Sequence, residues 1–189
     1  VTGISPLTTL TGGGSGGSFG AGTNTKFTLS GGGASDYVGK YSVITGDGTK
    51  FVTASDEYAQ SEDGAVYTYT YSGGSWGSPV KTQASDKVAD DSFGKSLAMN
   101  RSGTKLLVGQ PGYGNTTGHA YLYTYSGGSW GSELKFSPPS SGQVGDAFGT
   151  FVAMNDDGTK IIVGAPNDDD KGTDAGAAYI FTYSSGSWD

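Results

Sequence analysis

A unit of about 55 residues occurs three times in this chain, and this repeat limits the available folds more than any other feature of the sequence. A Gly-Thr-Lys tripeptide begins at Gly48, Gly103 and Gly158, with a spacing of 55 residues both times. A Gly-Ser-Trp tripeptide also recurs in each unit, so all three tryptophans occupy one repeat position. A fixed period of this length is typical of architectures that stack one supersecondary unit on the next.

Each unit contains strand-like runs in the same order. A tight glycine turn separates the first two runs, as in a hairpin, because glycine adopts positive φ at no steric cost. The continuous apolar residues at 105–108 and 160–163 predict second strands that are buried on both faces. The third runs alternate with a period of two, which indicates strands. The runs are 41–45, 50–53, 67–71 and 79–83 in the first unit, 96–100, 105–108, 121–125 and 133–137 in the second, and 150–155, 160–163 and 179–183 in the third. Four antiparallel strands per unit predict an all-β, propeller-like fold of three blades.

Two motifs in these units resemble the FG-GAP repeat of integrin-α-type β-propellers. In the third unit, Phe148-Gly149 is followed by Gly164-Ala165-Pro166. The corresponding residues are Phe93-Gly94 and Gly109-Gln110-Pro111 in the second unit, and Val38-Gly39 and Thr53-Ala54-Ser55 in the first. The resemblance covers roughly residues 25–189 and implies a propeller that binds proteins or glycans at a surface, although a fold alone does not determine function. The hairpins between the first two strands are too short for the calcium loops of that family.

The two ends of the chain predict how the blades are completed. Residues 1–24 are rich in Gly, Ser and Thr, which predicts an arm or linker, and the blades follow at about 31–83, 84–137 and 138–189. The alternating run 25–30 lies where the fourth strand of a preceding unit would lie, and the third unit has no such strand. We therefore expect the N-terminal strand to complete the last blade, of the same chain or of a neighbouring copy. The expected interface residues are Phe27, Leu29, Tyr179 and Phe181.

Composition excludes several classes of function. A formal net charge of −7 disfavours a nucleic-acid partner, because phosphate binding requires a basic surface. No run of 18 apolar residues predicts a membrane span, and the absence of cysteine removes disulfides and thiol chemistry. No nucleophile elbow, zinc-binding His-Glu-x-x-His or phosphate loop occurs, so we expect no enzymatic activity. The adjacent acids Asp90 and Asp91 keep a propeller-scaffold hydrolase open as an alternative.

Loops at one end of the predicted blades hold 13 of the 18 acidic residues. Their simplest role is solvation of the surface. A divalent-cation site is the alternative, because calcium prefers oxygen ligands, and its candidate ligands are Asp168, Asp169, Asp170 and Asp174. Tyr58 and Tyr113 in the same loops are candidates for ligand contact, and Asn100 and Asn115 begin N-glycosylation sequons.

These features together predict a non-enzymatic structural or adhesion protein of an extracellular or virion surface. We expect a homo-oligomer or filament that forms by strand completion and presents its blade loops to protein or glycan partners. A calcium-dependent glycan- or protein-binding module of a larger receptor-like chain is the first alternative, and the hydrolase is the second.

Overall fold

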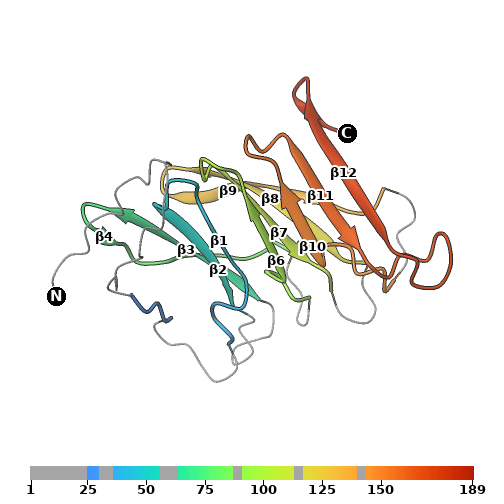
Figure 1. The fold of residues 1–189 in the computed structure, drawn as a ribbon, viewed down its shortest axis with the longest axis horizontal. Coiled ribbons are helices and arrows are strands. Elements are labelled where there is room, and N and C mark those ends of the chain that lie inside the picture. Colours follow the sequence, from blue (N-terminus) through green and yellow to red (C-terminus); the bar gives the residue numbers. More distant parts are fainter. Residues whose placement is uncertain (1–24, 30–35, 56–63, 87–90, 113–116, 140–143) are drawn as a thin grey trace, which may run out of the picture.

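The computed structural model describes residues 25–29, 36–55, 64–86, 91–112, 117–139 and 144–189, which fold into a row of three antiparallel β-sheets (Figure 1). The first blade contains β1 (Ser42–Ile44), β2 (Lys50–Ser55), β3 (Ala65–Ser72), β4 (Ser75–Trp76) and β5 (Val80–Thr82). The second contains β6 (Ser96–Met99), β7 (Lys105–Gln110), β8 (His119–Ser126) and β9 (Ser129–Phe136). The third contains β10 (Phe151–Met154), β11 (Lys160–Ala165), β12 (Ala177–Ser184) and β13 (Ser187–Trp188). Within the described ranges, no helix is long and apolar enough to cross a membrane.

Strands that follow one another in the chain are paired in every sheet, except for β4 and β5 of the first blade. In the first blade, β4 and β5 both pair with β3 and form one outer strand in two pieces. The break between them contains Pro79, which has no N–H to donate to a strand partner. In the second blade the outer strand β9 is continuous, and the register shifts between Leu122 and Thr124. The prediction of an all-β fold with three antiparallel blades of four strand positions is confirmed.

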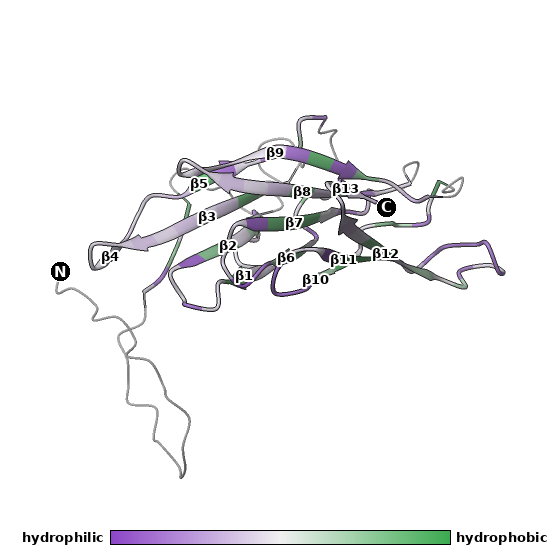
Figure 2. Ribbon diagram, turned by 90° about the horizontal axis from the view of Figure 1, so that it is seen from above, coloured by the Kyte–Doolittle hydropathy of each residue, from purple (hydrophilic) through white to green (hydrophobic). Residues whose placement is uncertain are grey.

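Two apolar cores join the three blades. The first core packs Val52, Ala54 and Val66 of the first blade against second-blade residues that include Phe93 and Tyr121. The second core packs Leu107, Ala120, Leu122 and Phe136 of the second blade against third-blade residues that include Phe148 and Ile161. Apolar segments of β2 and β7 are visible in Figure 2. The tyrosine ladders therefore serve blade packing, as their alternation predicts.

Burial on both faces holds for β7 and not for β11. Leu106, Leu107 and Val108 are all fully buried, as predicted, because a blade lies on each side of β7. In β11, Ile162 is 43% exposed. The prediction that the strand at 160–163 is buried on both faces was therefore wrong, because within the described residues no sheet covers the far side of the third blade.

The Phe-Gly pairs of the second and third blades each make contact with the blade before them. Phe148 is fully buried, and Gly149 has a φ of 96°. A Cβ at Gly149 would lie 2.2 Å from the carbonyl oxygen of His119, so only glycine allows this backbone approach. Gly39, the counterpart in the first blade, has no atom within 4 Å of such a Cβ. The motif thus acts as a spacer between consecutive blades, and it is unused where no blade precedes.

Residues 25–29 lie on the first blade and are not assigned as a strand. Phe27 packs edge-on against Phe51, Tyr69 and Trp76, at ring centroid distances of 4.8, 4.9 and 5.6 Å. This segment and β12 lie at opposite ends of the row of sheets (Figure 1). The option that the chain completes its own last blade is therefore not realised in this structure.

Candidate functional site

The third blade presents an apolar surface whose counterpart in the second blade is sealed. Ile162 of β11 pairs with Ile180 of β12, in the register in which Leu107 pairs with Leu122 one blade earlier. Leu107 and Leu122 are 0% and 5% exposed, whereas Ile162 and Ile180 are 43% and 66% exposed. The surface formed by Ala153, Ile162, Ala178 and Ile180 is the open face. Its exposure follows from the missing neighbour, since residue type and strand register are nearly the same.

The first blade presents the complementary half of such a contact. Met99 and Met154 occupy one repeat position, and each packs against the core that faces the preceding blade. Ile44 occupies the same position in the first blade and is 63% exposed. The first blade therefore exposes this face at Ile44, whereas Tyr67 and Tyr69 on the same face are buried in a cluster with Phe27 and Leu29.

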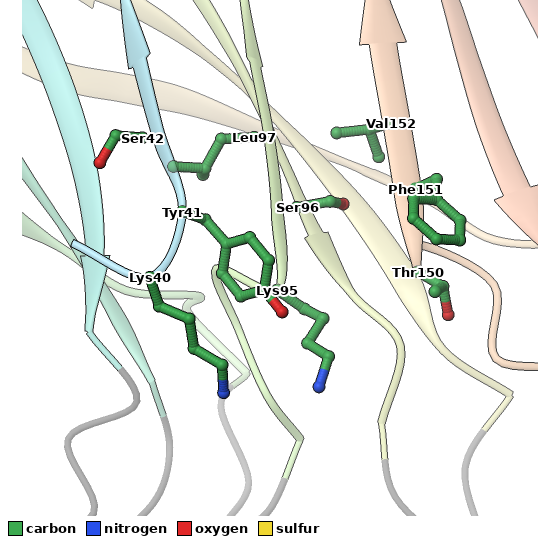
Figure 3. A pocket seen from close by; sticks show the side chains of 9 residues that line it. All are labelled: Lys40, Tyr41, Ser42, Lys95, Ser96, Leu97, Thr150, Phe151 and Val152. Carbon is green, nitrogen blue, oxygen red and sulfur yellow. The ribbon is translucent and has the colours of Figure 1, made fainter. Parts of the chain in front are cut away.

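A second candidate site is a cavity of about 490 Å³ on the innermost strands. It is lined by three consecutive residues of each blade, around the starts of β1, β6 and β10 (Figure 3). The first and third blades place the rings of Tyr41 and Phe151 at one repeat position, and the second blade has Ser96 there. The cavity exists because this small side chain lies between two aromatic ones. Ser96 itself donates its hydroxyl to the carbonyl oxygen of Gly149, at 2.9 Å.

The chemistry of this cavity differs from that of the whole chain. Lys40 and Lys95 extend in the same direction at its rim (Figure 3), and none of the described residues that line it is acidic. The ammonium group of Lys40 lies 5.8 Å from the ring centre of Tyr41, and Phe151 is 69% exposed. A protein of net charge −7 thus has a local basic site beside accessible rings. Such a site suits an anion that also has a flat apolar surface.

The predicted calcium ligands are engaged within their own loop. The carboxylate of Asp168 is buried and accepts hydrogen bonds from the Tyr179 hydroxyl, at 2.5 Å, and from the N–H of Asp170, at 3.1 Å. Asp169 accepts a hydrogen bond from the N–H of Asp174, at 2.7 Å. Among the described residues, no three acidic or histidine side chains converge as a metal site would require. The calcium site at these four residues stays a prediction.

Most of the residues predicted for ligand contact, hydrolysis and glycosylation lie outside the described part of the chain. Tyr58, Tyr113 and Asn115 lie outside the described residues, as does Asp90. Asn100 is buried, and its side chain donates to Ser102 and Thr104 and accepts from the N–H groups of Thr104 and Lys105. Glycosylation at Asn100 would require this hairpin network to open, and the glycosylation of Asn100 stays a prediction.

The predicted interface residues divide into two groups. Phe27 and Leu29 pack on Ala65, Tyr67 and Tyr69 of the first blade. Tyr179 and Phe181 pack in the core between the second and third blades, so their side chains point away from the open face. The exposed residues are their neighbours Ile162 and Ile180, which sequence reasoning missed. The repeat alignment with Leu107 and Leu122 was the signal that could have found them.

The Phe-Gly spacers and the three-blade row agree with the comparison with known families. The FG-GAP repeat family model matches residues 76–123 and 130–181. The chain belongs to the FG-GAP repeat family. The matched residues of this FG-GAP protein lie mainly in the second and third blades, where the Phe-Gly pairs are intact.

The solved structures that are similar to this chain include TolB from Acinetobacter baumannii, at 16% sequence identity and a TM-score of 0.47. The similarity covers 77% of this FG-GAP chain and 30% of TolB, so the chain corresponds to less than a third of that protein. No curated protein matched the sequence.

Proposed function

We propose that this FG-GAP protein is a non-enzymatic structural protein of an extracellular or virion surface, and that its copies associate head to tail through their blades. The open face carries this proposal. At the same positions of the second blade, which is followed by another blade, Leu107 and Leu122 are completely or almost completely buried. A contiguous exposed apolar surface of this kind marks a protein contact. The occupant that fits the face best is a blade of the same family, and a second copy supplies one.

The N-terminal segment supports the first blade as that occupant. Between the second and third blades, Phe136 of the outer strand β9 packs on Phe181 and Trp188, at 4.9 and 5.4 Å. Phe27 packs in the same way on Tyr69 and Trp76, the corresponding residues of the first blade. Residues 25–29 therefore hold, on the first blade, the position of an outer strand that belongs to a preceding blade.

This geometry predicts how the strand completion would occur. When the third blade of one copy docks on the first blade of the next, residues 25–29 of the second copy would lie beside β12 of the first. In the described residues, the outer side of β12 is paired with β13 only at Tyr183 and Ser184. A free strand edge accepts an added strand through its backbone N–H and C=O groups.

Mass measurements over a range of concentrations test this proposal. We expect the full chain to self-associate, and we expect Ile180→Asp and Ile44→Asp each to weaken association at least ~10-fold, equivalent to ~1.4 kcal/mol. Val144, which is 60% exposed and lies outside the strands, provides the matched control Val144→Asp. A monomeric full chain at high concentration, or an Ile180→Asp variant of unchanged mass distribution, would contradict the proposal.

The cavity on the innermost strands supports a second function, the binding of an acidic glycan. Two ammonium groups would pair with the carboxylates of uronic-acid sugars, and Tyr41 and Phe151 would stack on sugar rings. We expect a uronic-acid trisaccharide to bind and a neutral trisaccharide to bind at least ~10-fold more weakly in calorimetric titrations. Lys40→Gln combined with Lys95→Gln should abolish this preference, whereas Lys171→Gln, at an exposed loop lysine, should not. Equal binding of both sugars would contradict the acidic specificity.

A further inference from the structure

A lysine at the start of the second strand connects each blade to the next. Lys50 donates from its ammonium group to the carbonyl oxygen of Gly103, at 2.8 Å, in the hairpin turn of the second blade. The same nitrogen lies 3.2 Å from the ring centre of Tyr125 and 5.5 Å from that of Trp130. Burial in this position lowers the pKa of Lys50, and the nearby Asp47 opposes that effect. The cation is therefore held between a carbonyl group and two aromatic rings.

The contact is repeated between the second and third blades. Lys105 donates to the carbonyl oxygen of Gly158, again at 2.8 Å. Its ammonium group lies 5.3 Å from the ring centre of Tyr183 and 5.8 Å from that of Trp188. Two interfaces with the same donor, acceptor and ring pair show that this lysine contact belongs to the way in which these blades stack.

A backbone hydrogen bond accompanies the lysine contact at each interface. The N–H of Gly46 donates to the carbonyl oxygen of Arg101, at 3.1 Å, and the N–H of Arg101 donates to the carbonyl oxygen of Asp156, at 3.0 Å. The hairpin turns of consecutive blades are thus linked in one direction. At the third blade, the next donors in this series are the N–H of Asp156 and the ammonium group of Lys160.

The third blade provides the lysine, and the first blade provides its partners. Lys160 is exposed, and its ammonium group makes no hydrogen bond, ion pair or ring contact within the described part of the chain; only its backbone is bonded, to Asn155. At the other end, Tyr71 and Trp76 already form the receiving pair, with ring centroids 5.3 Å apart. The corresponding pair Tyr125 and Trp130, which holds Lys50, has a distance of 4.9 Å. The two halves of a third lysine contact are therefore present in one molecule, at opposite ends.

We propose that Lys160 of one copy binds the Gly48 carbonyl group and the rings of Tyr71 and Trp76 of a second copy, while the N–H of Asp156 donates to the carbonyl group of Gly46 in that copy. This inference rests on the proposed head-to-tail association and fixes its register. It places the hairpin turns of successive copies in the same continuous row that the three blades form inside one chain.

Site-specific disulfide formation tests this register, because the chain has no cysteine of its own. When Asp156→Cys chains and Gly46→Cys chains are mixed and oxidised, we expect a cross-linked dimer. The proposed register brings the Cα atoms of these two residues within the separation that a disulfide tolerates. A Cβ at Gly46 would crowd the flexible side chain of Arg101, at 2.9 Å, and would lie at an ordinary contact distance of 3.6 Å from its carbonyl oxygen, so the substitution can be accommodated. Within one chain, Arg101→Cys combined with Asp156→Cys is the positive control, since these backbones are hydrogen-bonded.

A second variant separates the lysine contact from the association itself. Lys160→Met should weaken association ~5-fold or more, whereas Lys171→Met should leave it unchanged. If Ile180→Asp abolishes association while Lys160→Met and the cysteine pair have no effect, the proposed register is wrong and the head-to-tail proposal stands. If the unmodified full chain is monomeric at every concentration, both are wrong.

Discussion

The second and third blades have nearly the same strand register and residue types, yet one is enclosed and the other is half open. Leu107 and Leu122 of the second blade lie in a core, and Ile162 and Ile180 of the third blade lie at the surface. The difference arises from what covers each sheet. Each blade of this repeat therefore has apolar residues on both faces, and it buries both sets only when another blade packs on each side.

The largest expected effect comes from truncating this apolar pattern in each blade. Leu107→Ala should lower the free energy of unfolding by ~2–5 kcal/mol, because it leaves a cavity in the core between the second and third blades. Ile162→Ala should cost less than ~1 kcal/mol in dilute, unassociated protein, because its side chain is largely solvated there. Urea denaturation measures both values. Equal losses for the two variants would refute the comparison.

The tryptophan position provides a smaller contrast between the same blades. Trp130 is buried and donates from its indole Nε1 to the hydroxyl of Thr68, at 2.7 Å. Trp188 has no such hydrogen bond among the described residues. Trp130→Phe should therefore cost ~1–3 kcal/mol, because it leaves a buried hydroxyl without its donor, and Trp188→Phe should cost less. Thermal denaturation of the two variants, with Thr68→Val combined with Trp130→Phe as the control, decides whether the lost hydrogen bond is the cause.

The enclosure of the second blade predicts how stability changes at alkaline pH. Burial and a hydrogen bond to Asp86 raise the pKa of Tyr121, and burial and a hydrogen bond to Glu133 raise the pKa of Tyr123. Unfolded tyrosines ionise near pH 10, so above this pH the unfolded state releases protons that the folded state keeps. Stability should fall as pH rises, and the urea midpoint should decrease between pH 9 and 11.

Absorbance at 295 nm provides the check on this prediction. The two tyrosines should ionise only as the chain unfolds, and Tyr123→Phe should reduce the pH dependence. Ionisation of every tyrosine near pH 10 in a folded chain would contradict the predicted enclosure.

The smallest expected effect concerns the hairpin turns. Hydrogen bonds from the Thr45 hydroxyl and from the N–H and hydroxyl of Thr49 lower the pKa of Asp47 to about 2. Because this pKa lies below the unfolded value, the contribution is present above about pH 4 and is lost as pH falls toward 2. Asp47→Ala should cost less than ~1 kcal/mol at pH 6, since the turn is solvated.

The same variant should differ less from the natural chain at pH 2.5, as measured by urea denaturation. The buried Asn100 of the second-blade hairpin is the comparison, and Asn100→Ala should cost more at both pH values. A loss for Asp47→Ala that does not depend on pH would contradict the role of its carboxylate.

Much of the architecture was predictable from the sequence. The spacing of Gly48, Gly103 and Gly158 and the alternating tyrosine runs predicted the all-β fold, because strand period and turn glycine are local properties. The Phe-Gly pairs predicted the family, which the family match confirmed. The candidate sites were less predictable. Tyr179 and Phe181 were expected at the interface, whereas their neighbours Ile162 and Ile180 are exposed.

The sequence by itself determined the strands, their turns and the repeat of a blade with two apolar faces. Only the tertiary structure decided which face of each blade is covered, that Asn100 is engaged in its hairpin, and that Lys50 and Lys105 bind the following blade while Lys160 does not. The physical reason is that burial and pairing depend on which blades lie side by side. Equivalent residues occupy the same repeat position in all three blades, so the repeat pattern alone does not indicate which of them are buried or paired.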